Sequence, residues 1–156
     1  MFDNKLHFLV LFAFLSLVPI GLQAQTEVAG EVLGIWDIEG SPYIVIEDIL
    51  IPNDEQLEIQ PGVEIRFNAN NCLYVNGMIL AEGNEENEIL FTNNDDDDQI
   101  TWRGIRCYES DEGSIISHAI IENAFPDSVL RYNKGGGIYT DQLSFLTLQN
   151  STIRNC

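Results

Sequence analysis

Basic side chains are scarce in this sequence. Its 156 residues include 7 Lys or Arg against 25 Asp or Glu, and the formal net charge is −18 at pH 7. A surface of this sign repels the phosphates of nucleic acids and the head groups of anionic lipids. We therefore expect no nucleic acid partner. Two interpretations of the acidity stay open, namely solubility of an exported protein or association with divalent cations.

A hydrophobic run long enough to span a membrane is also missing. Residues 8–20, FLVLFAFLSLVPI, fall short of the roughly 20 apolar residues that a spanning helix needs. The run follows Lys5 and precedes the small residue Ala24, as in a secretory signal peptide. We predict a signal peptide over residues 1–24, no membrane span after its cleavage, and a secreted or cell-surface (extracellular) protein. A membrane anchor is the alternative.

Cysteine is rare and occurs in an odd number. Cys72, Cys107 and Cys156 follow no CxxC pattern and have no zinc-type spacing with histidine. An exported protein can form disulfides, but at least one of these three thiols must remain free or pair outside the chain. The sequence does not choose a pair, and small buried core residues are the other interpretation.

Helical periodicity is absent after residue 40. Short runs of alternating apolar and polar residues appear instead, bounded by Gly, Asn, Pro and Asp, which is typical of many short strands. The runs are residues 43–49, 57–59, 63–67, 73–75, 78–83 and 89–92. Ordinary hairpins are one possible arrangement, since Asn76-Gly77 suits a tight hairpin turn.

Internal repeats favour a different arrangement. SIISHAIIENA and LTLQNSTIRNC align at an offset of 32, which matches Ile121 with Ile153 and Asn123 with Asn155. Upstream, GIRC matches GIYT at an offset of 33, and a shorter echo relates QPGVEI to VNGMIL at an offset of 15. A period of two or three short strands cannot bury its apolar residues alone, but stacked coils can. The repeats therefore predict a parallel β-helix, with Asn123 and Asn155 in a side-chain ladder.

Longer stretches resemble a known group of proteins. SPYIVIEDILIPNDEQLEIQPGVEIRF, LYVNGMILAEGNEENEILFT, TWRGIRCY and GGGIYTDQLSFLTLQNSTIRNC are similar to the right-handed parallel β-helix repeats of the pectin-lyase-like superfamily. Such repeats are common in exported Bacteroidetes-type surface proteins with a C-terminal sorting domain. The resemblance covers residues 33–156. It implies an all-β solenoid with an N-terminal entry or cap segment at 25–42 and coils at 43–156. Because a coil would stand open after Cys156, we expect a truncated portion of a longer protein.

The acidic run NNDDDDQ is the candidate metal site. Calcium takes several oxygen ligands, and Asp95, Asp96, Asp97 and Asp98 offer carboxylates in sequence. Adjacent residues of an extended loop point in different directions, however, and the spacing of a D-x-D-x-D-G loop is missing. A solvated turn before ITWRGI is the favoured interpretation. No other cofactor is predicted.

The sequence contains few arrangements of residues that suggest catalysis. Polysaccharide lyases of the superfamily use an Arg or Lys base beside acidic calcium ligands, so the resemblance directs attention to the basic residues. These candidates are Arg66, Arg103, Arg106, Arg131 and Lys134. In a strand, residues 103 and 106 would point to opposite faces and make a poor joint site. His118 alternates with Ile116 and Ile120, which would place it on the core face, and a structural or turn-facing role is favoured.

Two further motifs have structural interpretations that we prefer. NKGGGIYTD lacks the G-K-[ST] of a phosphate loop, and its glycines suit a tight turn with close approach of coils. Trp36 is expected to cap the first coil. The aromatic residues could instead form a surface on which sugars stack. They are Trp36, Tyr43, Tyr74, Trp102, Tyr108, Tyr132 and Tyr139.

These expectations combine into one functional prediction, in which no residue is assigned a catalytic role. The chain is a non-catalytic secreted or cell-surface scaffold for adhesion or carbohydrate contact, with a polysaccharide or another surface protein as partner. The alternative is the N-terminal part of a polysaccharide lyase or glycoside hydrolase of the same superfamily. Fold resemblance does not choose between them.

Overall fold

The chain folds into short β-strands joined by turns. The computed structural model describes residues 25–94, 101–125, 136–141 and 143–156, and this part of the chain contains no helix. No helix that is long and apolar enough to cross a membrane therefore occurs within these ranges. The expected signal peptide lies outside them.

The six strands expected from alternation are confirmed. They are β3 (Tyr43–Ile51), β4 (Gln56–Ile59), β5 (Glu64–Phe67), β6 (Leu73–Val75), β7 (Met78–Glu82) and β8 (Ile89–Asn93). Two strands precede them, β1 (Thr26–Glu31) and β2 (Gly34–Trp36). The later strands are β9 (Ile105–Cys107), β10 (Ile115–Ser117), β11 (Ala119–Glu122), β12 (Ile138–Thr140), β13 (Thr147–Gln149) and β14 (Thr152–Arg154).

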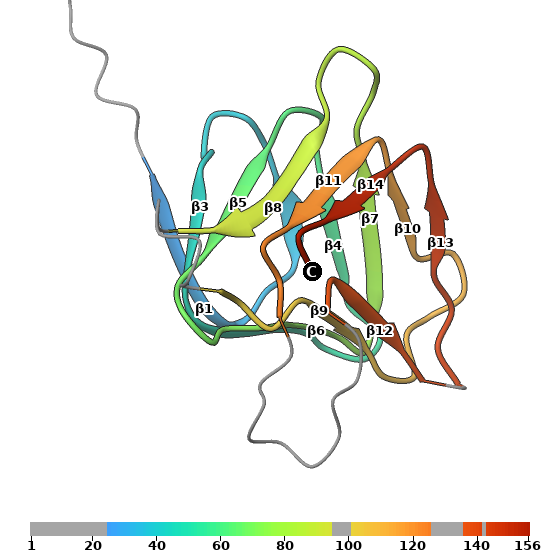
Figure 1. Cartoon of the computed structure of the whole chain (residues 1–156). Coiled ribbons are helices and arrows are strands. Elements are labelled where there is room, and N and C mark those ends of the chain that lie inside the picture. Colours follow the sequence, from blue (N-terminus) through green and yellow to red (C-terminus); the bar gives the residue numbers. More distant parts are fainter. Residues whose placement is uncertain (1–24, 95–100, 126–135, 142) are drawn as a thin grey trace, which may run out of the picture.

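All the named strands pair in parallel, and they form three faces around one interior (Figure 1). Strand β3 is long and bends: its first half pairs with β5 and its second half with β6. The first face therefore runs β3-β5-β8-β11-β14, and the second runs β3-β6-β9-β12. A separate sheet, β2-β4-β7-β10-β13, makes the third face. One passage of the chain through the three faces is called a coil below.

Strand register confirms the longer repeats. Ile121 pairs with Ile153, at the offset of 32 read from the sequence. Upstream, Ile105 pairs with Ile138 at an offset of 33. The echo at 15 is not a stacking period, because β5 and β7 belong to different faces. Coil length instead changes along the stack, since the turns between strands differ in length while the strands stay aligned.

The hairpin alternative is wrong. Strands β6 and β7 flank Asn76-Gly77, yet they belong to different sheets and do not pair with each other. Gly77 lies at the corner between two faces, where an added Cβ would come within 2.2 Å of the carbonyl oxygen of Pro52 in the preceding coil. The glycine thus permits close approach of two coils rather than a hairpin turn.

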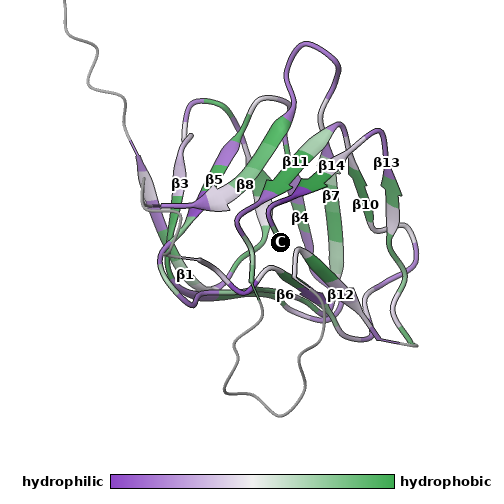
Figure 2. Ribbon diagram, viewed as in Figure 1, coloured by the Kyte–Doolittle hydropathy of each residue, from purple (hydrophilic) through white to green (hydrophobic). Residues whose placement is uncertain are grey.

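Alternate residues of each strand fill the interior. Ile49, Leu73 and Ile105 lie in register on three successive coils and are fully buried. Figure 2 shows hydrophobic residues on the strands and a hydrophilic turn between β7 and β8. Aligned apolar rows of this kind let each coil bury the next, which explains why such short strands are stable here.

Aromatic side chains stack inside the coils. Trp36 lies 4.4 Å from Tyr43, centroid to centroid, and both rings are buried. Phe67 stacks on Trp102 at 4.0 Å, and Trp102 also donates a hydrogen bond to the carbonyl oxygen of Glu122. The architecture is thus all-β, with parallel and strongly curled sheets, and it is compatible with a β-helix.

Candidate functional site

The fold divides the aromatic residues into two groups. Trp36, Tyr43 and Trp102 are buried, so they belong to the core. Tyr74, Tyr108 and Tyr139 lie on the outside of the second face, and Tyr132 is outside the described residues. The expected sugar-stacking surface is therefore much smaller than the sequence allowed.

These three outer tyrosines, called the tyrosine row, come from three successive coils. Tyr74 in β6 and Tyr139 in β12 both align with Arg106 of β9, which lies between them. Tyr108 follows β9 and fills the space between the other two rings. Its centroid is 6.3 Å from that of Tyr74 and 5.8 Å from that of Tyr139. Stacked coils thus place one aromatic ring per coil along the axis of the molecule.

Arg103 lies beside Tyr74 at one end of the tyrosine row. Its guanidinium carbon lies 6.0 Å from the centroid of Tyr74, and Nη2 donates to Asp48 Oδ1 at 2.7 Å. Nε donates to the carbonyl oxygen of Asn70 at 2.6 Å. Partial burial by itself would lower the pKa of Arg103, but the hydrogen bond with Asp48, and the charges that Tyr74, Asp48 and Cys72 carry when they are ionised, raise it above its usual value. The guanidinium therefore remains charged beside the ring.

Tyr74 is held between this cation and the next tyrosine. Burial, more than any nearby charge, raises the pKa of Tyr74. The phenol therefore stays protonated at neutral pH and keeps its hydrogen-bond donor. Tyr108 is the most open ring of the row, with 36% of its surface exposed. The row consequently offers partly exposed aromatic rings and their phenol groups to a ligand.

The expectation that Arg103 and Arg106 point to opposite faces is wrong. Arg103 lies before β9, and Gly104, with φ +81°, interrupts the extended backbone between the two residues. Strand alternation therefore does not apply across this segment. Both guanidinium groups lie near Cys72 on the second face. Arg106 is itself buried, and its Nη1 donates to the carbonyl oxygen of Gly136 at 3.3 Å.

All three cysteines are free thiols. Cys72 and Cys107 are buried, as expected for core residues, whereas Cys156 is exposed. Burial raises the pKa of Cys72 to about 12, although Arg106 and Arg103 oppose this effect, and raises that of Cys107 to about 11. Neither buried thiol forms a thiolate at neutral pH, so neither has the character of a nucleophile.

A cluster of hydrogen-bonded polar side chains lies on the outside of the first face. Glu122 accepts hydrogen bonds from Thr92 at 3.1 Å and from Arg154 at 2.7 Å, so it connects three successive coils. Asn123 donates to Asn93 Oδ1 at 2.8 Å. An asparagine ladder is thus present, but it joins Asn123 to the coil before it. No hydrogen bond joins Asn123 to Asn155 in the described part of the chain.

His118 lies at a corner rather than on the core face. Its φ of +46° places it in the turn between β10 and β11, and its Nε2 is 3.2 Å from Nδ2 of Asn150. Asn150 occupies the equivalent corner of the next coil, with φ +48°. The alternation with Ile116 ends at this corner, which corrects the core-face expectation and agrees with the turn-facing role.

The glycine-rich motif behaves as a close-packed corner where it can be described. A Cβ on Gly136 would come within 2.8 Å of the Cys156 backbone, and one on Gly137 within 2.8 Å of the Ile153 side chain. Close approach of coils is therefore confirmed at these two positions. The aspartates 95–98, Arg131 and Lys134 lie outside the described residues. Within those residues no group of three or more metal-binding side chains comes together.

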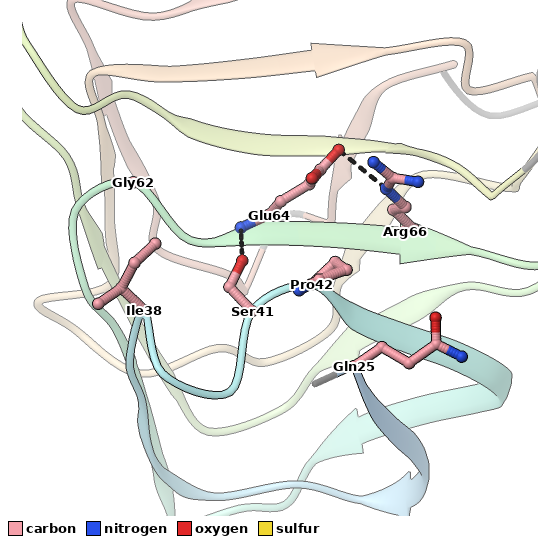
Figure 3. Close-up of a pocket in the computed structure, with 7 residues that line it drawn as sticks. All are labelled: Gln25, Ile38, Ser41, Pro42, Gly62, Glu64 and Arg66. Atoms are coloured by element: carbon pink, nitrogen blue, oxygen red, sulfur yellow. Dashed lines mark hydrogen bonds and ion pairs between the residues drawn. The ribbon is translucent and has the colours of Figure 1, made fainter. Parts of the chain in front are cut away.

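An open pocket of about 370 Å³ lies near the first strands (Figure 3). Glu64 and Arg66 of β5 form its polar side and pair with each other at 2.9 Å. The Ser41 hydroxyl accepts the Glu64 backbone N–H at 3.0 Å, and Pro42 and Ile38 provide apolar surface. Because the charged groups already satisfy one another, the pocket has less to offer a ligand than the tyrosine row.

The sequence alone did not single out the tyrosine row. Tyr74 and Tyr139 each lie in short alternating segments, but nothing in those segments shows that they share a face with Tyr108. The offsets between them become informative only once the strand register is known.

No family model matches the chain, and neither a curated protein nor a solved structure matches it at a significant level.

Proposed function

We propose that this chain is an exported, non-catalytic scaffold that contacts carbohydrate through the tyrosine row. In this proposal the fold is a right-handed parallel β-helix of the pectin-lyase-like type. Parallel strands joined by crossovers are right-handed in about 98% of known cases, which supports the assigned hand. The acidic surface and the apolar N-terminal run support export to the cell surface or the medium.

The observation that carries the proposal is the repeated placement of tyrosine on successive coils. Tyr74, Tyr108 and Tyr139 form one continuous aromatic surface, with Arg103 at its end. Aromatic rings pack against the C–H faces of sugars, while phenol and guanidinium groups bond to their hydroxyls. A linear polysaccharide lying along the axis would meet one tyrosine per coil.

Binding to soluble polysaccharides tests the proposal. The chain is run by affinity electrophoresis through gels that contain neutral or uronic-acid polysaccharides, and retention is compared with that of Tyr108→Ala. We expect the substitution to weaken retention by roughly tenfold, as for a central contact residue. Phe125→Ala removes another exposed ring, after β11 and outside the row, and is the control.

Two results would contradict the proposal. Equal retention of Tyr108→Ala and the unsubstituted chain on every retaining polysaccharide would exclude the tyrosine row as the contact surface. Shortening of a uronic-acid polysaccharide by the purified chain would contradict a non-catalytic role and favour the lyase or hydrolase alternative.

A further inference from the structure

The tyrosine row has a cation at one end whose charge is already neutralised. Arg103 lies beside Tyr74, and its Nη2 donates to both carboxylate oxygens of Asp48, at 2.7 and 2.5 Å. Its Nε donates to the carbonyl oxygen of Asn70 at 2.6 Å. The Arg103 side chain is only 18% exposed, whereas that of Asp48 is 44% exposed. A ligand that approaches this end of the row therefore meets the carboxylate more readily than the guanidinium.

A second cation, Arg106, is held inside the protein. It lies in register between Tyr74 and Tyr139, but only 7% of its surface is exposed. Its Nη1 donates to the carbonyl oxygens of Ile105 at 3.2 Å and of Gly136 at 3.3 Å. Along the described part of the second face, the cationic side chains are these two arginines. Arg106 has too little exposed surface to bond a ligand that lies on the tyrosine rings.

Acidic residues follow the other two tyrosines of the row. Glu109, which is exposed, comes directly after Tyr108, and Asp141 comes two residues after Tyr139. A hydrogen bond from the Ser144 hydroxyl, more than any other contact, lowers the pKa of the Asp141 carboxyl group. This carboxylate is therefore ionised at neutral pH. Because like charges repel over roughly 8 Å at physiological ionic strength, an anionic ligand would be repelled along the whole row.

We propose that Asp48 determines which class of polysaccharide the tyrosine row accepts. By neutralising Arg103 it favours uncharged polysaccharides and excludes uronic-acid polysaccharides. A uronic-acid carboxylate could bond Arg103 only by displacing Asp48, which would leave that carboxylate without its ion-pair partner. Sugar hydroxyls meet no such penalty, because phenol groups both donate hydrogen bonds to them and accept hydrogen bonds from them. This inference rests on the carbohydrate contact proposed above and adds the class of ligand.

Paired ligands that differ in charge test this inference. A soluble β-glucan and a galactomannan are each immobilised in the neutral form and after oxidation of their primary hydroxyl groups to carboxylates, which converts hexose units to uronic acids. Dissociation constants of the purified chain are measured at low ionic strength, where charges are least screened. We expect a neutral form to bind roughly tenfold more tightly than the oxidised form of the same polymer.

Asp48→Asn releases the charge of Arg103 while keeping an oxygen that can accept the Cys72 backbone N–H. We expect this variant to bind the oxidised forms roughly tenfold more tightly than the unsubstituted chain does, because a charged donor becomes available to a carboxylate. The gain should disappear at about 1 M salt, where the Debye length is about 3 Å. It should also disappear when Arg103→Gln is added. Loss of structure would weaken binding, so it cannot produce this gain.

Glu47→Gln is the matched control. It removes the same charge from the exposed residue next to Asp48, and Glu47 forms no ion pair within the described residues. Because this substitution releases no cation, binding of the oxidised forms should change by less than about twofold. Circular dichroism checks that each variant retains its β-structure.

Three results would overturn the inference and leave the carbohydrate contact intact. The first is that the unsubstituted chain binds oxidised forms as tightly as neutral ones. The second is an equal gain in Asp48→Asn and Glu47→Gln, which would mean that overall charge decides rather than Arg103. The third is a gain that persists after Arg103→Gln is added. If neither form of either polymer bound, the proposed function itself would be contradicted, and this inference with it.

Discussion

Arg103 and Asp48 lie 55 residues apart in the sequence, and Nη2 of Arg103 donates to both carboxylate oxygens of Asp48, at 2.7 and 2.5 Å. Asp48 also accepts the backbone N–H of Cys72 at 2.9 Å. One carboxylate therefore joins three successive coils at the side of the tyrosine row. The guanidinium that lies over Tyr74 is held in place by this carboxylate.

Removing the charge of Asp48 should loosen this connection. We expect Asp48→Asn to lower the free energy of unfolding by about 1 kcal/mol, the upper range for a partly exposed ion pair. Urea unfolding measures the change. Glu47→Gln neutralises the neighbouring carboxylate, which makes no ion pair with the described residues, and should not destabilise the fold. An equal loss in both variants would mean that the Arg103 contact contributes nothing specific.

Gly104 should tolerate no side chain. Its φ is +81°, and an added Cβ would lie 2.2 Å from the carbonyl oxygen of Gly136 in the next coil. Gly104→Ala should therefore lower the free energy of unfolding by about 3 kcal/mol. Part of this loss comes from holding alanine at a left-handed φ, and part from displacing the neighbouring backbone. Gly30 has φ +71° with no atom within 4 Å of an added Cβ. Gly30→Ala isolates the conformational strain, at about 1 kcal/mol. Similar losses in the two variants would refute close approach at Gly104.

The buried thiols should make stability fall at alkaline pH. Burial raises the pKa of Cys72 from 9.0 to about 12 and that of Cys107 from 9.0 to about 11. Between pH 9 and the folded values, the unfolded chain loses these protons while the folded chain keeps them. The free energy of unfolding should therefore decrease as pH rises through this range, and be unaffected by these groups below it.

Urea unfolding at pH 8 and pH 10.5 measures this dependence, with Cys72→Ala as the comparison. The variant should be less stable at pH 8 because of the lost packing, but its stability should fall less between the two pH values. Thiol labelling provides an independent check. Cys156 should react in the folded chain, whereas Cys72 and Cys107 should react only after unfolding. Rapid labelling of all three would contradict the burial.

Much of the fold could be predicted because its signals are local. Alternation in residues 63–67 and 73–75 reports which residues face inward, and Pro, Gly and Asn mark the corners. The offset of 32 also predicts the register between two strands directly, since Ile121 and Ile153 occupy the same position in neighbouring coils. Alternation does not predict side-chain direction at the corners, however, because residues with positive φ interrupt the extended backbone there. His118 and the segment from Arg103 to Arg106 show this limit.

The sequence by itself determined that this chain is all-β, repetitive and strongly acidic, because strand period, turn residues and charge are properties of neighbouring residues. Only the tertiary structure decided which aromatic residues are core and which form the tyrosine row. That distinction depends on the lengths of the turns between strands. These lengths set the register between coils and so bring Tyr74, Tyr108 and Tyr139 together on one face.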